Sequence, residues 1–129
     1  MIDWRAVVAV AVGAAIGGVL RYVIGQIFLQ RFGPGFPYGT LFINVTGSFC
    51  IGIVAELGVT RALGMTPLLR ILLATGVLGG YTTFSTFSLD AVLLLAEGVM
   101  LPVLYAVTSV VLGFAGAAAG IVLVRLAQR

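Results

Sequence analysis

The chain has 129 residues, of which 61% are hydrophobic and only 9% are charged, and its net charge is +3. A soluble domain carries about 25% charged residues, so the composition excludes a soluble domain and predicts an integral membrane protein. The absence of His and the single Cys, Cys50, exclude an intramolecular disulfide, Cys–His or Ser–His catalysis and most metal sites. All seven basic residues are Arg, and in so apolar a chain they are expected to anchor the membrane interface rather than to bind nucleic acid.

The length of the chain predicts four membrane spans. A spanning helix needs about 20 apolar residues, so residues 1–129 hold four spans and their connections in a single domain. The predicted spans cover residues 6–30, 40–59, 67–96 and 102–126, and the expected fold class is an all-α membrane protein. Four thin, Gly-rich helices can hardly enclose a solvated pathway alone, so a pathway is expected to need more than one copy of the chain.

The first predicted span contains a G-x-x-x-G motif at Gly13 and Gly17. This spacing lets a neighbouring helix approach closely, although a chain with 18 Gly residues can also contain it by chance. Arg5, the apolar run and the small residues that follow also fit a signal peptide. That alternative is disfavoured because the later segments are equally apolar.

The second predicted span carries polar side chains at Asn44, Thr46 and Ser48. Asn44 and Ser48 are four residues apart and share one helix face. An amide without a partner in hydrocarbon costs several kcal/mol, so Asn44 is expected to face protein or water. Two interpretations stay open: a hydrogen bond that serves packing only, or a donor in a functional site.

Residues 76–88 interrupt the third predicted span with Gly, Ser and Thr, between the apolar runs 68–75 and 89–96. A break in a membrane helix is tolerated only where protein or a water-filled cavity satisfies its backbone. Unwinding near Gly79 and Thr82 would free carbonyls as ligands for a small hard cation. It would also create a half-helix N-terminus near residues 83–85, which favours an anion.

Phe84 and Phe87 follow this break three residues apart. The edge of a phenyl ring is electropositive, so the pair could face an anion; the alternative is packing or lipid contact. Together with the hydroxyls of residues 85–88 and the amide of Asn44, the set suits a small, strongly hydrated anion. It suits a proton-coupled carrier poorly, because the first and second spans have no acid at mid-membrane.

The fourth predicted span places Tyr105, Thr108 and Ser109 along one polar stripe, and Gly113, Gly116 and Gly120 on a close-packing face. Four spans put both termini and the 60–67 connection on one side of the membrane. Five arginines fall on that side and two on the other: Arg5, Arg61, Arg70, Arg125 and Arg129 against Arg21 and Arg31. This distribution favours cytoplasmic termini.

Three motifs in order resemble the Fluc/CrcB family of fluoride channels. They are GGVLRY at 17–22, GTLFINVTG at 39–47 and the stretch 76–87 with its GGYTTFSTF core. The resemblance covers essentially the whole chain, and the length and four-span layout match as well.

The resemblance implies an antiparallel, dual-topology homodimer with two pores in the bacterial cell membrane. Such a channel lets fluoride leave the cell passively, which reduces fluoride toxicity, and it is not an enzyme. It also implies a structural sodium ion at the dimer centre, held by the main-chain carbonyls of Gly79 and Thr82. The pore residues that it implies are Thr40, Asn44, Phe84, Phe87, Tyr105 and Ser109. Arg21 matches a family arginine whose role, vestibule charge or structural cap, stays open.

One feature departs from this pattern, because dual topology needs a weak orientation bias and the arginines divide five to two. The main alternative function is a small multidrug-resistance-type proton-coupled exporter, which has a similar length and span number. Such exporters use a membrane-embedded Glu in the first span, and this first span has none. A third class is a structural membrane subunit, which would leave Asn44 and the hydroxyls of residues 82–88 unexplained.

Overall fold

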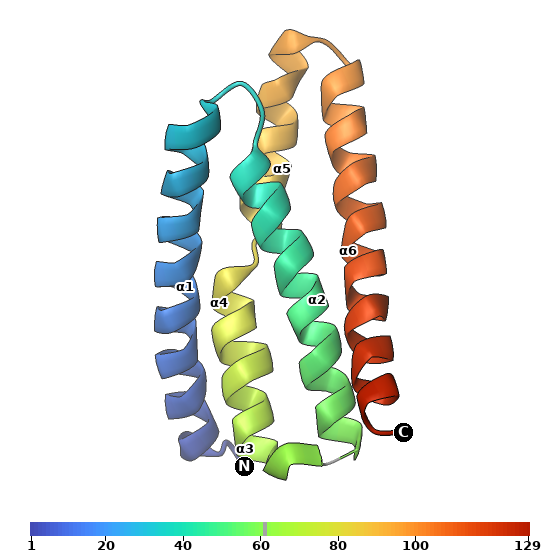
Figure 1. Ribbon diagram of the computed structural model, residues 1–129. Coiled ribbons are helices and arrows are strands. Elements are labelled where there is room, and N and C mark those ends of the chain that lie inside the picture. Colours follow the sequence, from blue (N-terminus) through green and yellow to red (C-terminus); the bar gives the residue numbers. More distant parts are fainter. Residues whose placement is uncertain (61) are drawn as a thin grey trace.

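The computed structural model describes residues 1–60 and 62–129, and these residues form an all-helical bundle (Figure 1). Its long apolar segments are Trp4–Phe32, Tyr38–Thr60, Pro67–Glu97 and Met100–Ala127, each long enough to cross a membrane. The prediction of an all-α protein with four spans is confirmed. Each observed segment reaches slightly beyond its predicted bounds, at one end or at both, because the last turns continue into the interfacial residues.

The helices follow one another as α1 (Trp4–Phe32), α2 (Tyr38–Thr60), η1 (Ala62–Gly64), α3 (Pro67–Arg70), η2 (Ile71–Leu78), α4 (Gly79–Tyr81), α5 (Phe84–Leu93), η3 (Leu94–Glu97) and α6 (Met100–Ala127). Helix α1 begins where the Asp3 side chain accepts a hydrogen bond from the N–H of Arg5 at 2.9 Å. It ends at Gly33, whose φ of 74° lies in the left-handed region that favours glycine.

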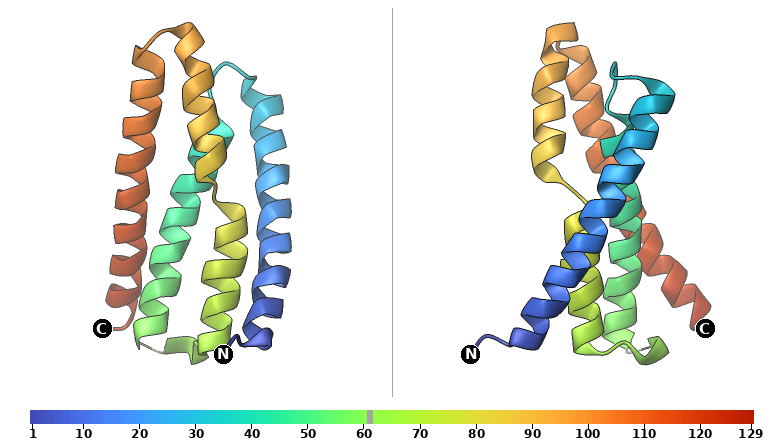
Figure 2. Two further views of the ribbon diagram at one scale, coloured as in Figure 1. Left: turned by 180° about the vertical axis from the view of Figure 1, so that it is seen from behind. Right: turned by 90° about the vertical axis from the view of Figure 1, so that its left-hand side faces the viewer.

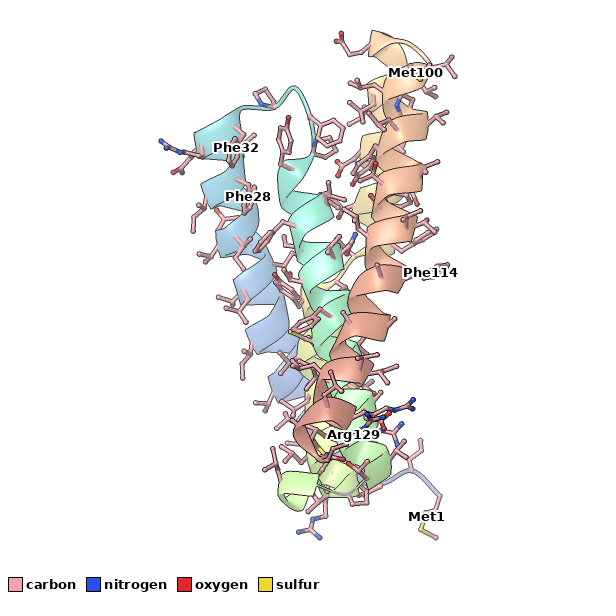
Figure 3. All side chains as sticks on the ribbon, turned by 45° about the vertical axis from the view of Figure 1, so that its right-hand side comes forward. Met1, Phe28, Phe32, Met100, Phe114 and Arg129 are labelled. Atoms are coloured by element: carbon pink, nitrogen blue, oxygen red, sulfur yellow. The ribbon has the colours of Figure 1, made fainter. Side chains whose placement is uncertain are left out.

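Both chain termini lie at one end of the bundle together with α3, while the α1–α2 connection and the connection into the start of α6 lie at the other end (Figure 1). Met1 and Arg129 mark the first end, and Phe32 and Met100 mark the second (Figure 3). This layout agrees with the predicted sidedness of the loops. Arg61, one of the five arginines counted on the terminus-bearing side, lies outside the described residues.

The third span is broken, as predicted, but in more steps than a single loop. It runs as α3, the π-helix η2, α4, an extended pair at Thr82–Thr83 and then α5. Thr82 has φ −79° and ψ 159°, and Thr83 has φ −152° and ψ 120°. The helix therefore stops for two residues about halfway along the bundle (Figures 1 and 2).

The G-x-x-x-G motif of α1 packs directly against the backbone of the third span. A Cβ atom added to Gly13 would lie 2.6 Å from the carbonyl oxygen of Leu72, and one added to Gly17 would collide with the carbonyl of Val77. Packing of this kind holds membrane helices together, because lipid provides no hydrophobic driving force between them. The prediction of a close-packing face on α1 is confirmed.

Three glycines precede the break, at positions 76, 79 and 80, and two of them serve this same contact. Gly76 is buried against Gly13, and a Cβ atom on Gly80 would lie 2.6 Å from the carbonyl oxygen of Ala14. Both residues lie in helical segments. Their small size is therefore used for the approach of α1, and the loss of helical structure falls on the two threonines that follow.

Helices α2 and α6 approach each other through a second set of glycines. A Cβ atom on Gly52 would collide with the carbonyl of Ala117, and one on Gly120 would collide with the carbonyl of Phe49. Beyond this contact, α1 and α6 tilt in opposite directions and diverge toward the terminus-bearing end (Figure 2).

We predict that Gly17→Ala lowers the free energy of unfolding by about 1–3 kcal/mol, the usual cost of overpacking a tight contact. The measurement is unfolding of the purified protein in mixed micelles. Gly18→Ala is the matched control, because nothing lies within 4 Å of a Cβ atom at that position. Equal losses in the two variants would contradict the assignment of Gly17 to the contact.

Candidate functional site

The side chain of Asn44 holds the broken backbone of the third span. Its Nδ2 donates to the carbonyl oxygen of Thr83 at 3.0 Å, and its Oδ1 accepts from the N–H of Thr83 at 2.9 Å. In a continuous helix this N–H would bond to the carbonyl of Gly79. Asn44 therefore supplies the hydrogen bonds that the break removes, and half of its amide donor capacity is already used.

The same break releases main-chain carbonyls from their helical partners, those of Gly79 and Thr82 among them. The N–H of Thr83 bonds to Asn44 instead of Gly79, and the N–H of Thr86 bonds to Thr83 Oγ1 at 3.2 Å instead of Thr82. The carbonyl oxygen of Thr82 accepts a long hydrogen bond from Arg21 Nη1 at 3.4 Å. Arg21, which is half-buried on α1, therefore contacts the break directly.

The second half of the broken span begins with a cluster of hydroxyls. Thr83 is the N-cap of α5, and its Oγ1 also lies 3.0 Å from Thr86 Oγ1 and 3.3 Å from Ser85 Oγ. The first turn of a helix has N–H groups without helical partners and a partial positive charge. The predicted start of a half-helix at residues 83–85 is confirmed, since α5 begins at Phe84.

A cavity of about 370 Å³ lies against the break, between α2, η2, α5 and α6. The cavity is lined by most of the residues that were singled out from the sequence, either for their side chains or for their main-chain carbonyls. They are Asn44, Ser48, Gly79, Thr82, Phe84, Phe87 and Ser109. The hydroxyl of Ser109 is buried and has no hydrogen-bond partner among the described residues. A buried hydroxyl without a partner is unusual, so this one is available to water or to a ligand in the cavity.

The two phenylalanines at the cavity differ in exposure. Phe84 is 80% exposed and Phe87 is half-buried, with ring centroids 5.8 Å apart. Phe87 also packs on the ring of Tyr105, with a centroid distance of 5.1 Å. Packing within one chain therefore does not account for Phe84, which points to lipid or to a second molecule.

Thr40 and Tyr105 lie in a separate polar cluster around Asp90. Thr40 Oγ1 donates to Asp90 Oδ2 at 2.7 Å, and the Tyr105 hydroxyl donates to the same oxygen at 3.4 Å. Tyr105 is fully buried, and neither residue lines the cavity at the break. Phe87, which touches Tyr105 and lines the cavity, lies between the two clusters.

Asp90 was not among the site residues predicted from the sequence. The available signal was its position: it follows Phe87 by three residues and precedes the apolar run 91–96. An acid on a helix face shared with a predicted site residue deserves to be considered with that site.

The polar residues of the described chain do not form a side-chain metal site. Within residues 1–60 and 62–129, no group of three or more His, Cys, Asp or Glu side chains is arranged to hold a metal ion. A cation bound near the break would therefore depend on main-chain oxygens.

Residues 8–121 match the family described as CrcB-like protein, Camphor Resistance (CrcB). The chain is 52% identical over 120 residues to a fluoride-specific ion channel FluC of Rhizobium meliloti (strain 1021), which covers 92% of this chain and 95% of the relative. It is 49% identical over 124 residues to a fluoride-specific ion channel FluC of Nitrobacter winogradskyi, which covers 95% of this chain and 98% of the relative. A FluC of Rhizobium etli (strain ATCC 51251) is 52% identical over 117 residues, covering 90% of this chain and 93% of that relative.

We predict that Asn44→Ala destabilises the protein by about 1–3 kcal/mol, because it leaves the N–H of Thr83 without its partner in a low-dielectric site. Unfolding in mixed micelles measures the effect. Ser48→Ala is the matched control, since Ser48 lies on the same helix face and lines the same cavity without touching the break backbone. A loss for Ser48→Ala as large as that for Asn44→Ala would refute this role.

Proposed function

This chain, a multi-pass bacterial membrane protein, belongs to the CrcB-like family, and from that premise we propose that it is a fluoride-selective channel. The relatives named above are fluoride-specific ion channels, a class of transporters rather than enzymes. The observation that carries the proposal is the cavity at the break, where a free hydroxyl and two phenyl rings meet the start of α5. Hydrogen-bond donors that are not already paired with an acidic side chain suit a small anion.

Fluoride is proposed to exchange its hydration water for donors in this cavity. Ser109 offers a hydroxyl without a partner, and the second N–H of the Asn44 amide is not used by Thr83. The first turn of α5 adds a partial positive charge. These donors replace water without a fixed countercharge, so the anion is stabilised and still able to leave.

Phe84 and Phe87 are proposed to carry the anion onward past their ring edges, which are weakly electropositive. Phe87 connects the cavity to the cluster of Thr40, Asp90 and Tyr105. Chloride is larger and accepts hydrogen bonds more weakly, so a narrow pathway lined by donors disfavours it. The transport is proposed to be passive, and its direction follows the electrochemical gradient of fluoride, which lets the cell lose fluoride and reduces its toxicity.

We propose that the channel is an antiparallel homodimer formed by chains inserted in both orientations. The 80% exposure of Phe84 and the exposed position of Gly79 support this proposal, because both residues are left uncovered by a single chain beside the break. A second copy would cover them and close the pathway. The uneven distribution of arginines means that insertion in both orientations has to be tested directly.

A structural sodium ion is proposed to join the two breaks. The carbonyls of Gly79 and Thr82 have lost their helical partners, and carbonyl oxygens are ligands for a hard cation. The residues therefore fit the ion, although one chain offers too few oxygens for a complete shell. When bound, sodium would neutralise the partial negative charge of the carbonyls. Within each chain, the Arg21 guanidinium already supplies part of the compensating positive charge at the Thr82 carbonyl.

We predict that Phe84→Ile slows fluoride efflux from liposomes at least about tenfold while the protein stays folded, because the ring packs against little within its own chain. A fluoride electrode records the efflux, with chloride efflux for comparison. Phe114→Ile is the matched control: Phe114 is 75% exposed on α6 and points away from the bundle (Figure 3).

The outcome of this experiment also separates the competing functions. Fluoride efflux that is fast, selective over chloride and independent of a proton gradient supports the channel. Efflux that requires a proton gradient would favour a proton-coupled exporter, and absence of transport by well-folded protein would favour a structural subunit.

We predict that sodium stabilises the purified protein relative to N-methylglucamine at the same ionic strength. A ligand that binds only the folded state at a hundredfold excess over its Kd adds about 2.7 kcal/mol. Thermal unfolding monitored in both salts measures the difference, and potassium at equal concentration is the control for ion size. Identical unfolding midpoints in all three salts would remove sodium from the proposal without affecting the fluoride pathway.

A further inference from the structure

A second and larger groove is lined by residues of α3 and of the segments next to it. Helix α3 lies at the end of the bundle that carries both termini (Figure 1). The groove has a volume of about 880 Å³ and is formed by the end of α2, the segment before α3, and the start of η2. The residues that matter for its chemistry are Gly58, Thr66, Arg70, Ala74 and Thr75.

This groove leads toward the cavity at the break. Ala74 lines both of them. On α2, Asn44, Ile51 and Gly58 follow one another at intervals of seven residues, so they lie on one helix face, and they line the cavity and the groove in that order. The two spaces are therefore consecutive along the same side of α2, from the membrane interface to the break.

Arg70 gives the outer part of this path an uncompensated positive charge. In the described part of the chain, the ion pair joins Arg125 to Glu56, with Nε and Oε1 2.9 Å apart, and Glu56 is buried. Arg70 is exposed and has no carboxylate within 4 Å among the same residues.

Gly58 provides the space in which the Arg70 side chain lies. A Cβ atom added to Gly58 would be 2.9 Å from Arg70 Cδ and 3.1 Å from Arg70 Nε. The stem of Arg70 thus lies across the backbone of α2, and its guanidinium carbon is 3.6 Å from the same Cβ position, beside the groove that both residues line.

We infer that Arg70 attracts anions into this groove and thereby raises the rate at which fluoride reaches the break. This inference rests on the proposed channel function and assigns its entrance. A charge of one sign in a cleft with low-dielectric walls focuses the field and raises the local concentration of the opposite ion. Arg70 acts on entry by its charge, while the donors at the break act on the desolvated ion.

The test uses Ala74→Cys in a Cys50→Ser background, because Cys50 is an exposed free thiol. We expect a negatively charged methanethiosulfonate to react with the cysteine at position 74 faster than a positively charged one of similar size. Adding Arg70→Gln should lower the ratio of their reaction rates about three- to tenfold in low salt, and Arg70→Lys should retain it. The difference should nearly vanish in 1 M salt, where the Debye length is about 3 Å.

The companion measurement is fluoride efflux at low fluoride concentration with Ala74 unchanged. Arg70→Gln is expected to lower the initial rate about two- to fivefold, Arg70→Lys to restore it, and Arg129→Gln, a charge change at the same end that does not line the groove, to leave it unaltered. An unchanged reagent ratio together with unchanged efflux would overturn the role of Arg70. So would an effect equal to that of Arg129→Gln, or one insensitive to salt.

The two measurements separate this inference from the function on which it rests. If wild-type protein shows no fluoride efflux, the channel proposal fails, whatever the reagents report. If wild-type protein conducts and Arg70→Gln changes neither rate nor ratio, the channel stands and the groove is not its charged entrance. If the Arg70 guanidinium contacts lipid phosphate and not the groove, Arg70→Gln is expected to leave both the efflux rate and the reagent ratio unchanged.

Discussion

The two hydrogen bonds between the Asn44 side chain and the backbone of Thr83 allow a membrane helix to stop being helical in the middle of its span. Hydrocarbon offers no partner for an unwound peptide group, so such a break exists only where protein supplies one. Once Asn44 has done so, the carbonyls of Gly79 and Thr82 lose their helical partners and α5 begins with its own N-terminus. The other features of the site follow from this substitution of a side chain for a helical turn.

Glycine packing keeps the break in place. Gly13 and Gly17 bring α1 against η2, and Gly52 and Gly120 bring α2 against α6. Because lipid is as apolar as the helix surfaces, the bundle is held together by such close contacts and not by the burial of apolar side chains. They also bring Arg21 to the Thr82 carbonyl and Ser109 into the cavity beside Asn44.

The polar groups lie at three depths, and each depth has a different chemistry. The break offers neutral donors, and Thr40 and Tyr105 converge on Asp90 beyond Phe87. Toward the terminus-bearing end, Glu56 compensates Arg125, whereas Arg70 remains uncompensated in its groove. Most charge thus lies toward the ends, and the cavity at the break offers uncharged donors where a full charge is most costly. Arg21, which donates to the Thr82 carbonyl, is the charged side chain at the break.

The sequence by itself determined the membrane class, the four spans, the break and the start of a half-helix beside Phe84, because hydropathy and helix-breaking residues are local properties of the chain. It also required a polar environment for Asn44, since an amide cannot face lipid alone. Only the tertiary structure decided that Asn44 bonds to Thr83, 39 residues away, and that Asp90 joins Thr40, 50 residues away. It likewise assigned Gly76 and Gly80 to packing against α1. These pairings depend on the rotation, tilt and separation of neighbouring helices, and the close contacts of glycine with backbone set those quantities across the bundle.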